Sequence, residues 1–175
     1  MTDCWVAPES LFDGQDIVHG QAVRIVDGRI TEIAKTPDSA VRIKGCLTPG
    51  FVDLQVNGGG GVMLNTTPTR SGMADIAAAH RTFGTVAVMP TVITDHWAVL
   101  EQAADAAIAA KGDDGIIGLH IEGPHISVAR RGTHNASHIR PMDDRTLNVV
   151  AGLRRHDIAV MITVAPEATT HDQIA

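Results

Sequence analysis

A carboxylate with imidazoles near it is the feature of this sequence most able to do chemistry. Glu122 ends an apolar run, Gly123-Pro124 interrupts that run, and His120 lies two positions before Glu122. Because side chains alternate across a strand, His120 and Glu122 are expected on one face. A carboxylate and imidazoles are ligands that zinc or iron accepts. The spacing alone leaves a second interpretation open, in which Glu122 is a solvated strand end and the histidines are core or surface residues.

The segment after this strand, residues 124–141, is predicted to be a long loop. It contains Arg131-Gly132-Thr133-His134-Asn135. Loops of this length inside a compact domain are often functional, so His134 is a second candidate. Taken by itself, His134 would be assigned as a solvent-exposed histidine.

Alternating strand and helix patterns follow residue 47. The expected strands are 51–56, 85–93, 116–121 and 158–164, and the expected helices are 71–83, 96–111 and 143–155, with first turns of another at 169–175. Ser71 and either Thr94 or Asp95 are predicted to cap the first two helices, and Asp143 or Asp144 to begin the third. Repeated units of this kind predict parallel strands with outer helices. Where repeated strand–helix units close into a barrel, the active site lies at the carboxyl ends of the strands.

The first 45 residues have a different pattern, with alternating apolar and polar positions. The segments 22–26 and 29–33 flank Asp27-Gly28, which is a strong signal for a two-residue β-hairpin turn. This part of the chain is therefore predicted to be β-structure.

Bulk composition limits the function classes. The chain has 175 residues, 44% hydrophobic and 19% charged, which is enough for a core and gives no sign of disorder. The net charge of -6 argues against a nucleic-acid or anionic-membrane surface. With no signal peptide, no apolar span and only two cysteines, a soluble cytoplasmic protein without nucleic-acid or membrane partners is expected.

Five segments in one order carry a family resemblance. They are residues 47–58, the glycine run 58–61, and residues 118–124, 132–135 and 163–167. This series resembles the N-acetylglucosamine-6-phosphate deacetylases of the amidohydrolase superfamily, from about residue 20 to the end. The resemblance implies an α/β fold in which residues 47–175 form the first four βα units, or first half, of a metal-dependent-hydrolase TIM-type (β/α)8 barrel. Residues 1–46 would form part of a small β-sandwich before it.

The resemblance also assigns roles at the site. Glu122 would be a ligand of one divalent metal ion of the zinc or iron class, and Thr133 and His134 would contact the sugar. Gln55 and Asn57 stand where many amidohydrolases carry a metal-binding histidine pair, which indicates the single-metal subgroup.

Supporting roles remain for three side chains. Gln55, Asn57 and His120 would contact the metal-bound water or support the ligands. A structural alternative is that Gln55 and Asn57 satisfy backbone groups at the barrel mouth. His125 stands where the family often has an aromatic residue and could pack against substrate.

The implied reaction is hydrolysis of N-acetyl-D-glucosamine 6-phosphate to D-glucosamine 6-phosphate and acetate. Family members are about twice this long, and their two later histidine ligands and acid/base aspartate would lie beyond residue 175. No catalytic residue is therefore expected in this chain, which by itself should be an inactive fragment. Two alternatives stay open: a half-barrel interaction protein, and an amidohydrolase acting on another N-acyl or cyclic amide substrate.

An open half-barrel would also be expected to associate with another polypeptide chain. A homo-oligomer, or pairing with a separate C-terminal half, is expected because such a fold leaves strand edges and apolar side chains uncovered. The apolar residues expected to be exposed are Val86, Val88, Ile117, Leu119, Val160 and Ile162.

Overall fold

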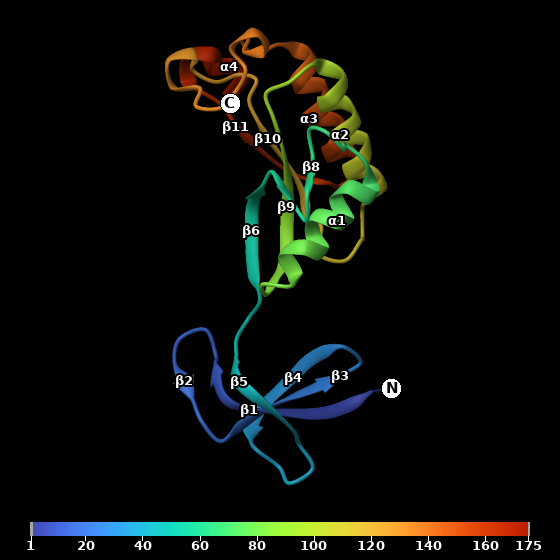
Figure 1. Ribbon diagram of the computed structural model, residues 1–175, viewed down its shortest axis with the longest axis vertical. Coiled ribbons are helices and arrows are strands. Elements are labelled where there is room, and N and C mark those ends of the chain that lie inside the picture. Colours follow the sequence, from blue (N-terminus) through green and yellow to red (C-terminus); the bar gives the residue numbers. More distant parts are fainter. Residues whose placement is uncertain (1, 175) are drawn as a thin grey trace. The chain divides into compact units, whose positions relative to one another are not determined.

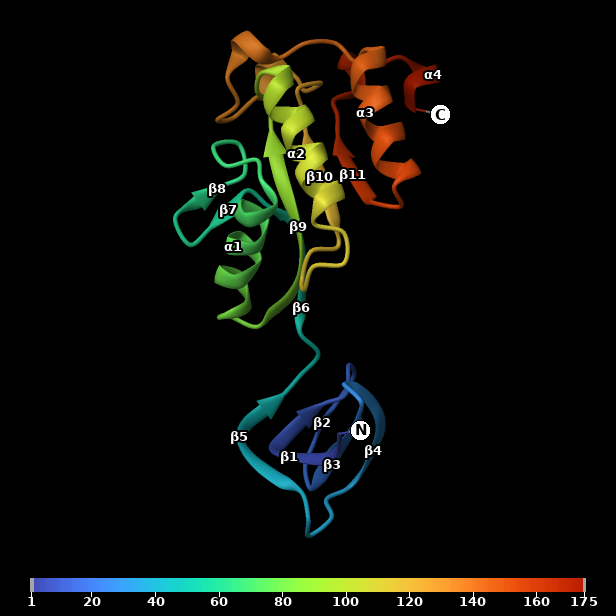
Figure 2. The same cartoon turned by 90° about the vertical axis from the view of Figure 1, so that its right-hand side faces the viewer.

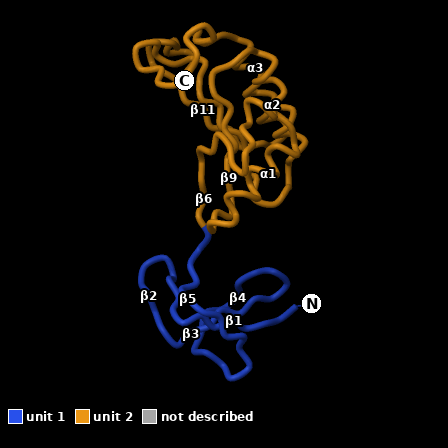
Figure 3. The backbone as a smooth tube through the Cα atoms, in the orientation of Figure 1, with its two compact units in different colours: residues 1–50 blue, residues 51–175 orange. Residues whose placement is uncertain are grey.

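The computed structural model describes residues 2–174 and consists of two compact units, residues 1–50 and 51–175 (Figures 1 and 3). No helix in the described part of the chain is long and apolar enough to span a membrane.

The first unit is a five-stranded sheet. Its strands are β1 (Asp3–Phe12), β2 (Ile17–Val18), β3 (Gln21–Val26), β4 (Arg29–Lys35) and β5 (Val41–Leu47). The order β2-β1-β3-β4 is antiparallel throughout, and β5 pairs with β1 in parallel. Asp27 and Gly28 have φ values of 48° and 76°, as a hairpin turn of the predicted kind requires. The hairpin prediction for residues 22–33 is confirmed.

The second unit is built on a parallel sheet in the order β11-β10-β9-β6. Strands β6 (Phe51–Val56) and β9 (Thr85–Ile93) have the predicted bounds, and β10 (Gly118–Glu122) and β11 (Ala159–Thr163) lie close to theirs. The glycine run forms part of a small hairpin of β7 (Gly58–Gly59) and β8 (Val62–Met63). The antiparallel and parallel sheets agree with the predicted α/β class.

Helices α1 (Arg70–Arg81), α2 (Trp97–Ala109) and α3 (Asp144–Arg155) cover one face of this sheet (Figure 2). Short elements complete the unit: η1 (Val128–Arg130), η2 (Ala136–His138), η3 (Pro166–Ala168) and α4 (His171–Ile174). The predicted turns at 169–175 correspond to α4, except that residue 175 lies outside the described residues.

The predicted helix caps are partly wrong. Thr69, not Ser71, caps α1 by accepting a hydrogen bond from the backbone N–H of Gly72. His96 occupies the N-cap position of α2 and makes no capping hydrogen bond with its side chain. Neither Thr94 nor Asp95 caps α2: the Thr94 hydroxyl contacts His134, and Asp95 Oδ1 accepts from the backbone N–H of His96, which precedes the helix. Asp143 caps α3, as predicted.

The core of the second unit lies between the sheet and the helices. Val88 and Leu119 belong to this core and are 1% and 0% exposed, so the prediction that they would be uncovered is wrong. Val86 and Ile117, two residues earlier on the chain, lie outside the core cluster and are exposed, as predicted. Val160 and Ile162 are half-buried against the core.

Candidate active site

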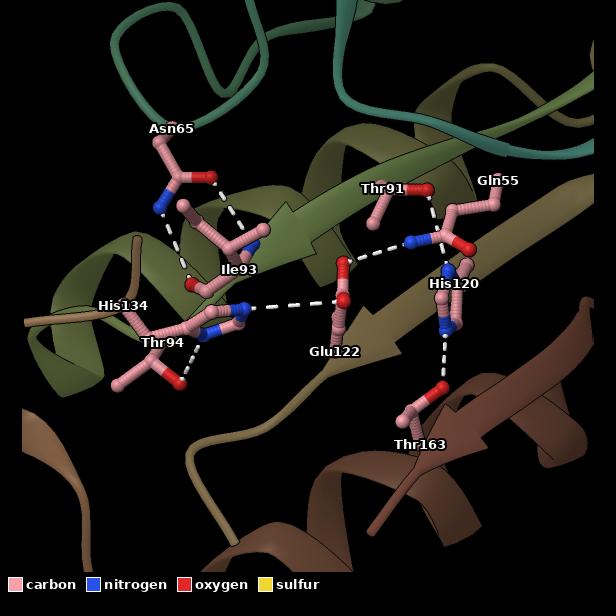
Figure 4. A network of polar contacts seen from close by, with 9 residues as sticks. All are labelled: Gln55, Asn65, Thr91, Ile93, Thr94, His120, Glu122, His134 and Thr163. Atoms are coloured by element: carbon pink, nitrogen blue, oxygen red, sulfur yellow. Dashed lines mark hydrogen bonds and ion pairs between the residues drawn. The ribbon is translucent and has the colours of Figure 1, made fainter. Parts of the chain in front are cut away.

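Polar side chains from all four parallel strands meet at one edge of the sheet. Because the strands run in the same direction, their carboxyl ends lie at the same edge, where α/β enzymes place their sites. Glu122 is the last residue of β10 and pairs in register with Ile93 at the end of β9 and Thr163 at the end of β11. Gln55 is the penultimate residue of β6. Register therefore brings the ends of β9, β10 and β11 to one level, whereas β6 ends opposite Pro90, and the Gln55 side chain extends from there to Glu122 (Figure 4).

Glu122 lies between Gln55 and His134 (Figure 4). The Gln55 amide donates from Nε2 to Oε2 of Glu122 over 2.9 Å. On the other side, His134 Nε2 is 3.7 Å from Glu122 Oε1, and the two side chains are 8% and 21% exposed. The structure therefore brings together three of the side chains selected from the sequence.

His134 is held in a fixed orientation. Its Nδ1 lies 2.8 Å from the hydroxyl of Thr94, and Arg131 Nη1 donates to its backbone carbonyl over 2.7 Å. When the Thr94 hydroxyl donates to Nδ1, the ring proton is on Nε2, the nitrogen that faces Glu122. His134 is thus a buried, positioned group rather than a solvent-exposed histidine.

Gly123 makes room for this arrangement. Its φ is +79°, and a Cβ built on it would collide with Oγ1 of Thr94. Only glycine adopts this backbone conformation readily and also leaves the Thr94 hydroxyl in place.

His120 is buried in β10, and its ring contacts hydroxyl groups on neighbouring strands. It is 1% exposed, with Nδ1 3.2 Å from the hydroxyl of Thr91 and Nε2 2.8 Å from that of Thr163. Thr91 Oγ1 also accepts from the backbone N–H of Val56. Burial lowers the pKa of His120, although the charge of Glu122 partly opposes this. The side chain therefore links four strands as a neutral imidazole.

Two other selected residues do not join the cluster through their side chains. Thr133 is exposed, and Asn57 follows β6, where its backbone carbonyl accepts from Leu64. Neither side chain makes a hydrogen bond within residues 2–174. Gln55 contacts a carboxylate, so it does not satisfy a backbone group as the structural alternative held.

His125 does not face a substrate site. It is 0% exposed, and its ring nitrogens contact the carbonyl of Arg140 at 2.9 Å and the hydroxyl of Thr146 at 2.8 Å. The expectation that it packs against substrate is wrong, because both ring nitrogens are used within the chain.

Asn65 belongs to this network, although the sequence did not indicate it. Its side chain accepts from the backbone N–H of Ile93 and donates to the Ile93 carbonyl and to Asp95 Oδ2, at 2.9, 3.1 and 2.9 Å. This amide completes the pairing at the end of β9, from which Thr94 extends (Figure 4). Asn65 lies 28 residues before Ile93, and no local sequence pattern indicates this contact.

The donor set at Glu122 is incomplete for a metal. Catalytic zinc takes three protein ligands, from His, Cys, Asp or Glu. Within residues 2–174, Glu122 belongs to no group of three such side chains with converging ligand atoms. Glu122 can supply one anionic ligand, and the neutral amide of Gln55 orients it. The described residues around Glu122 therefore fit one part of a metal centre only.

Comparison with known proteins identifies relatives of one kind. The chain is 48% identical over 133 residues to an N-acetylgalactosamine-6-phosphate deacetylase from Shewanella sp. (strain ANA-3), covering 74% of this chain and 33% of the relative. It is 31% identical over 171 residues to the N-acetylglucosamine-6-phosphate deacetylase of Homo sapiens, covering 94% and 39%. The chain thus spans about a third to two fifths of the length of these curated relatives. No family model matches it.

Solved structures of enzymes with the same names are also similar to this chain. The N-acetylglucosamine-6-phosphate deacetylase of Pasteurella multocida superposes with a TM-score of 0.81 at 26% identity, covering 95% of this chain and 46% of that one. A mutant of the Mycobacterium smegmatis enzyme in complex with N-acetyl-D-glucosamine-6-phosphate gives 0.82 at 25% identity, covering 95% and 44%.

Proposed function

We propose that this chain, which is homologous to part of the N-acetylglucosamine-6-phosphate deacetylases, supplies the Glu122 side of a metal-dependent deacetylase active site. The observation that supports this most directly is the placement of Glu122 between Gln55 and His134 at the carboxyl ends of parallel strands. On this proposal the unit is the first half of a (β/α)8 barrel, and the remaining ligands and the acid/base group come from outside residues 2–174.

The reaction would convert an N-acetylhexosamine 6-phosphate to the free amine and acetate, as part of amino-sugar breakdown in the cytoplasm. A bound divalent ion, of the zinc or iron class, would polarise the acetamide carbonyl and lower the pKa of its water. Glu122 would hold this ion, and Gln55 would fix the direction of the Glu122 lone pairs. His134 would donate from Nε2 to an oxygen of the sugar or acetamide, in the orientation that Thr94 imposes. Thr133, which is exposed on the same loop, would contact the sugar.

A second substrate is supported by one comparison. The relative with 48% identity is named for N-acetylgalactosamine 6-phosphate, whereas the human relative named for the glucosamine compound is 31% identical. The two sugars differ only in the configuration of one hydroxyl group, so one site chemistry serves both. We therefore propose the galacto compound as an alternative substrate.

Acetate release tests the function. The chain alone should give no metal-dependent release from either sugar phosphate, because the Glu122 site lacks converging ligands. A hybrid in which this chain replaces the corresponding part of the Shewanella relative should release acetate, and Glu122→Gln should abolish that release. Glu32→Gln, an exposed carboxylate of the first unit, is the matched control. A folded, metal-loaded hybrid that cleaves neither substrate contradicts the proposal.

A further inference from the structure

A second group of ligand-type side chains lies beside the candidate active site. We propose that Asp95, His96 and His138 bind one divalent cation of the zinc class, which fastens the loop carrying His134 to the end of β9. This group is separate from Glu122 and comes from residues that the sequence had not indicated as ligands.

The geometry suits a small cation. The potential ligand atoms of the three side chains all lie within 4.8 Å of one another. The ring centroids of His96 and His138 are 4.1 Å apart, and the ring planes are tilted by 58° relative to each other. Tetrahedral zinc with bonds of about 2.0–2.1 Å needs donor atoms about 3.3 Å apart. Because His96 is exposed, a small rotation of its side chain closes the remaining gap.

The carboxylate is oriented by neighbours. Asp95 Oδ1 accepts from the backbone N–H of His96 at 2.7 Å, and Oδ2 accepts from Asn65 at 2.9 Å. Partial burial raises the pKa of Asp95, but these hydrogen bonds and the neighbouring imidazoles of His138 and His96 bring it below its usual value. Outer hydrogen bonds of this kind are what metal-ligating carboxylates have in proteins.

The two imidazoles are free to bind. Within residues 2–174, no ring nitrogen of His96 or His138 makes a hydrogen bond. A structural interpretation assigns Asp95 to the positive end of α2 and treats the rings as stacked. It accounts for the carboxylate but not for two unpaired imidazoles converging on it. One carboxylate and two imidazoles are a known ligand set for zinc and iron.

Arg140 brings the two sides of the site together. Its Nη1 donates to the backbone carbonyls of Asp95 at 3.3 Å and His138 at 2.9 Å, and its guanidinium lies 4.0 Å from the centroid of Trp97. Its positive charge opposes a cation, but this through-space repulsion is weaker than three direct ligand bonds. Arg140 thereby fixes the spacing of the two segments that carry the ligands.

The site shares these two segments with the Glu122 cluster. Thr94, which holds Nδ1 of His134, directly precedes Asp95, and His134 lies four positions before His138. A cation here would limit the motion of the loop and keep His134 next to Glu122. This consequence for the active site rests on the proposed function, whereas metal binding itself does not.

Cobalt titration of the purified, chelator-treated chain tests the proposal. Co²⁺ should bind with visible absorption typical of nitrogen and oxygen ligands, and Zn²⁺ should displace it. Asp95→Asn keeps the size of the side chain and His138→Phe keeps an aromatic ring, and each should weaken binding at least 100-fold, beyond the roughly 10–100-fold loss from removing an outer partner. The exposed control His171→Phe should bind like the wild type, and in Glu122→Gln the absorption of this site should persist.

Hydrogen exchange provides a second measurement. Zn²⁺ should slow exchange in residues 131–140 of the wild type but not in His138→Phe. If His138→Phe does not fold, His96→Gln at an exposed position serves in its place. Wild-type protein without Co²⁺ absorption, or ligand variants that bind Co²⁺ as the wild type does, overturns the cation site. Acetate release by the hybrid is scored separately, so either proposal can fail alone.

Discussion

Gln55 and Glu122, 67 positions apart in the chain, share a hydrogen bond of 2.9 Å at the carboxyl ends of β6 and β10. Gln55 donates, so the bond stabilises the ionised form of the carboxylate. An amide here directs one oxygen of Glu122 toward β6 and leaves the other toward His134.

Replacing Gln55 with Leu should cost about 1 kcal/mol of unfolding free energy, because a hydrogen bond to a partly buried carboxylate is lost. A double-mutant cycle with Glu122→Ala, which removes the acceptor oxygens, measured by urea unfolding, should give a coupling energy of about 0.5–1 kcal/mol. Gln15→Leu, on the first unit, is a control with an exposed amide. Strict additivity of the two substitutions would show that the contact does not form in solution.

In the active hybrid, Glu122→Gln and His134→Ala should have different effects. The first should abolish kcat together with metal occupancy, since an amide cannot supply an anionic ligand. The second should mainly raise KM, by about 10-fold or more, because it removes one hydrogen bond to substrate, worth about 1–3 kcal/mol. Kinetics with metal analysis of each variant separates the effects. Normal metal content and rate in Glu122→Gln would show that Glu122 is not a ligand.

Thr94→Val should disturb His134 while preserving the shape of the side chain. The buried Nδ1 loses its partner, which costs about 1–3 kcal/mol of stability. The His134 ring resonances should also change in NMR spectra, because the hydroxyl no longer sets the tautomer. Thr31→Val, on an exposed strand of the first unit, removes a hydroxyl that donates to the Arg24 carbonyl at 3.5 Å and should leave the His134 resonances unchanged. Unchanged His134 resonances in Thr94→Val would contradict the assigned orientation.

Acid should destabilise the protein through His125. Burial lowers the pKa of this imidazole below its ordinary value of 6.5, although the Arg140 carbonyl and the charge of Asp143 oppose the effect. The unfolded chain therefore binds the proton more tightly, and stability falls as pH drops below 6.5. Urea midpoints between about pH 7.5 and 5 should decline more steeply for the wild type than for His125→Gln. Equal slopes would mean that His125 is protonated in the fold.

The exposed apolar residues of β6 predict association. Phe51, Val52 and Leu54 are 65%, 58% and 48% exposed along one strand at the edge of the parallel sheet. Such patches are uncommon on monomers. Sedimentation across a dilution series should show oligomers, and Val52→Glu should shift them toward monomer. Val128→Ser, which alters an apolar residue of η1 that is 61% exposed, should not. A monodisperse wild-type monomer would contradict the prediction.

Local patterns in the sequence predicted most of the fold. Asp27-Gly28 and the apolar runs of β6 and β9 depend on neighbours in the chain, so their positions were correct. The caps of α1 and α2 were misplaced because several Ser, Thr and Asp residues compete there. At Thr94 a tertiary contact with His134 decided the outcome.

The candidate site was only partly predictable because several of its contacts are also tertiary. Strand periodicity and family resemblance selected Glu122 and His134, whose proximity the structure then showed. The group of Asp95, His96 and His138 depends on the path of an irregular loop, which no periodic pattern reports. His125 was misassigned because its partners, Arg140 and Thr146, lie 15 and 21 positions away.

Gly123 contributes no ligand, charge or proton, yet the direction in which His134 points depends on it. A methyl group there would push aside the Thr94 hydroxyl, and with it the hydrogen-bonding partner of His134 Nδ1. Among natural variants that keep this chemistry, we therefore expect position 123 to tolerate less change than many residues that bind substrate. A survey restricted to reactive side chains would miss this constraint, because residue 123 acts through having no side chain.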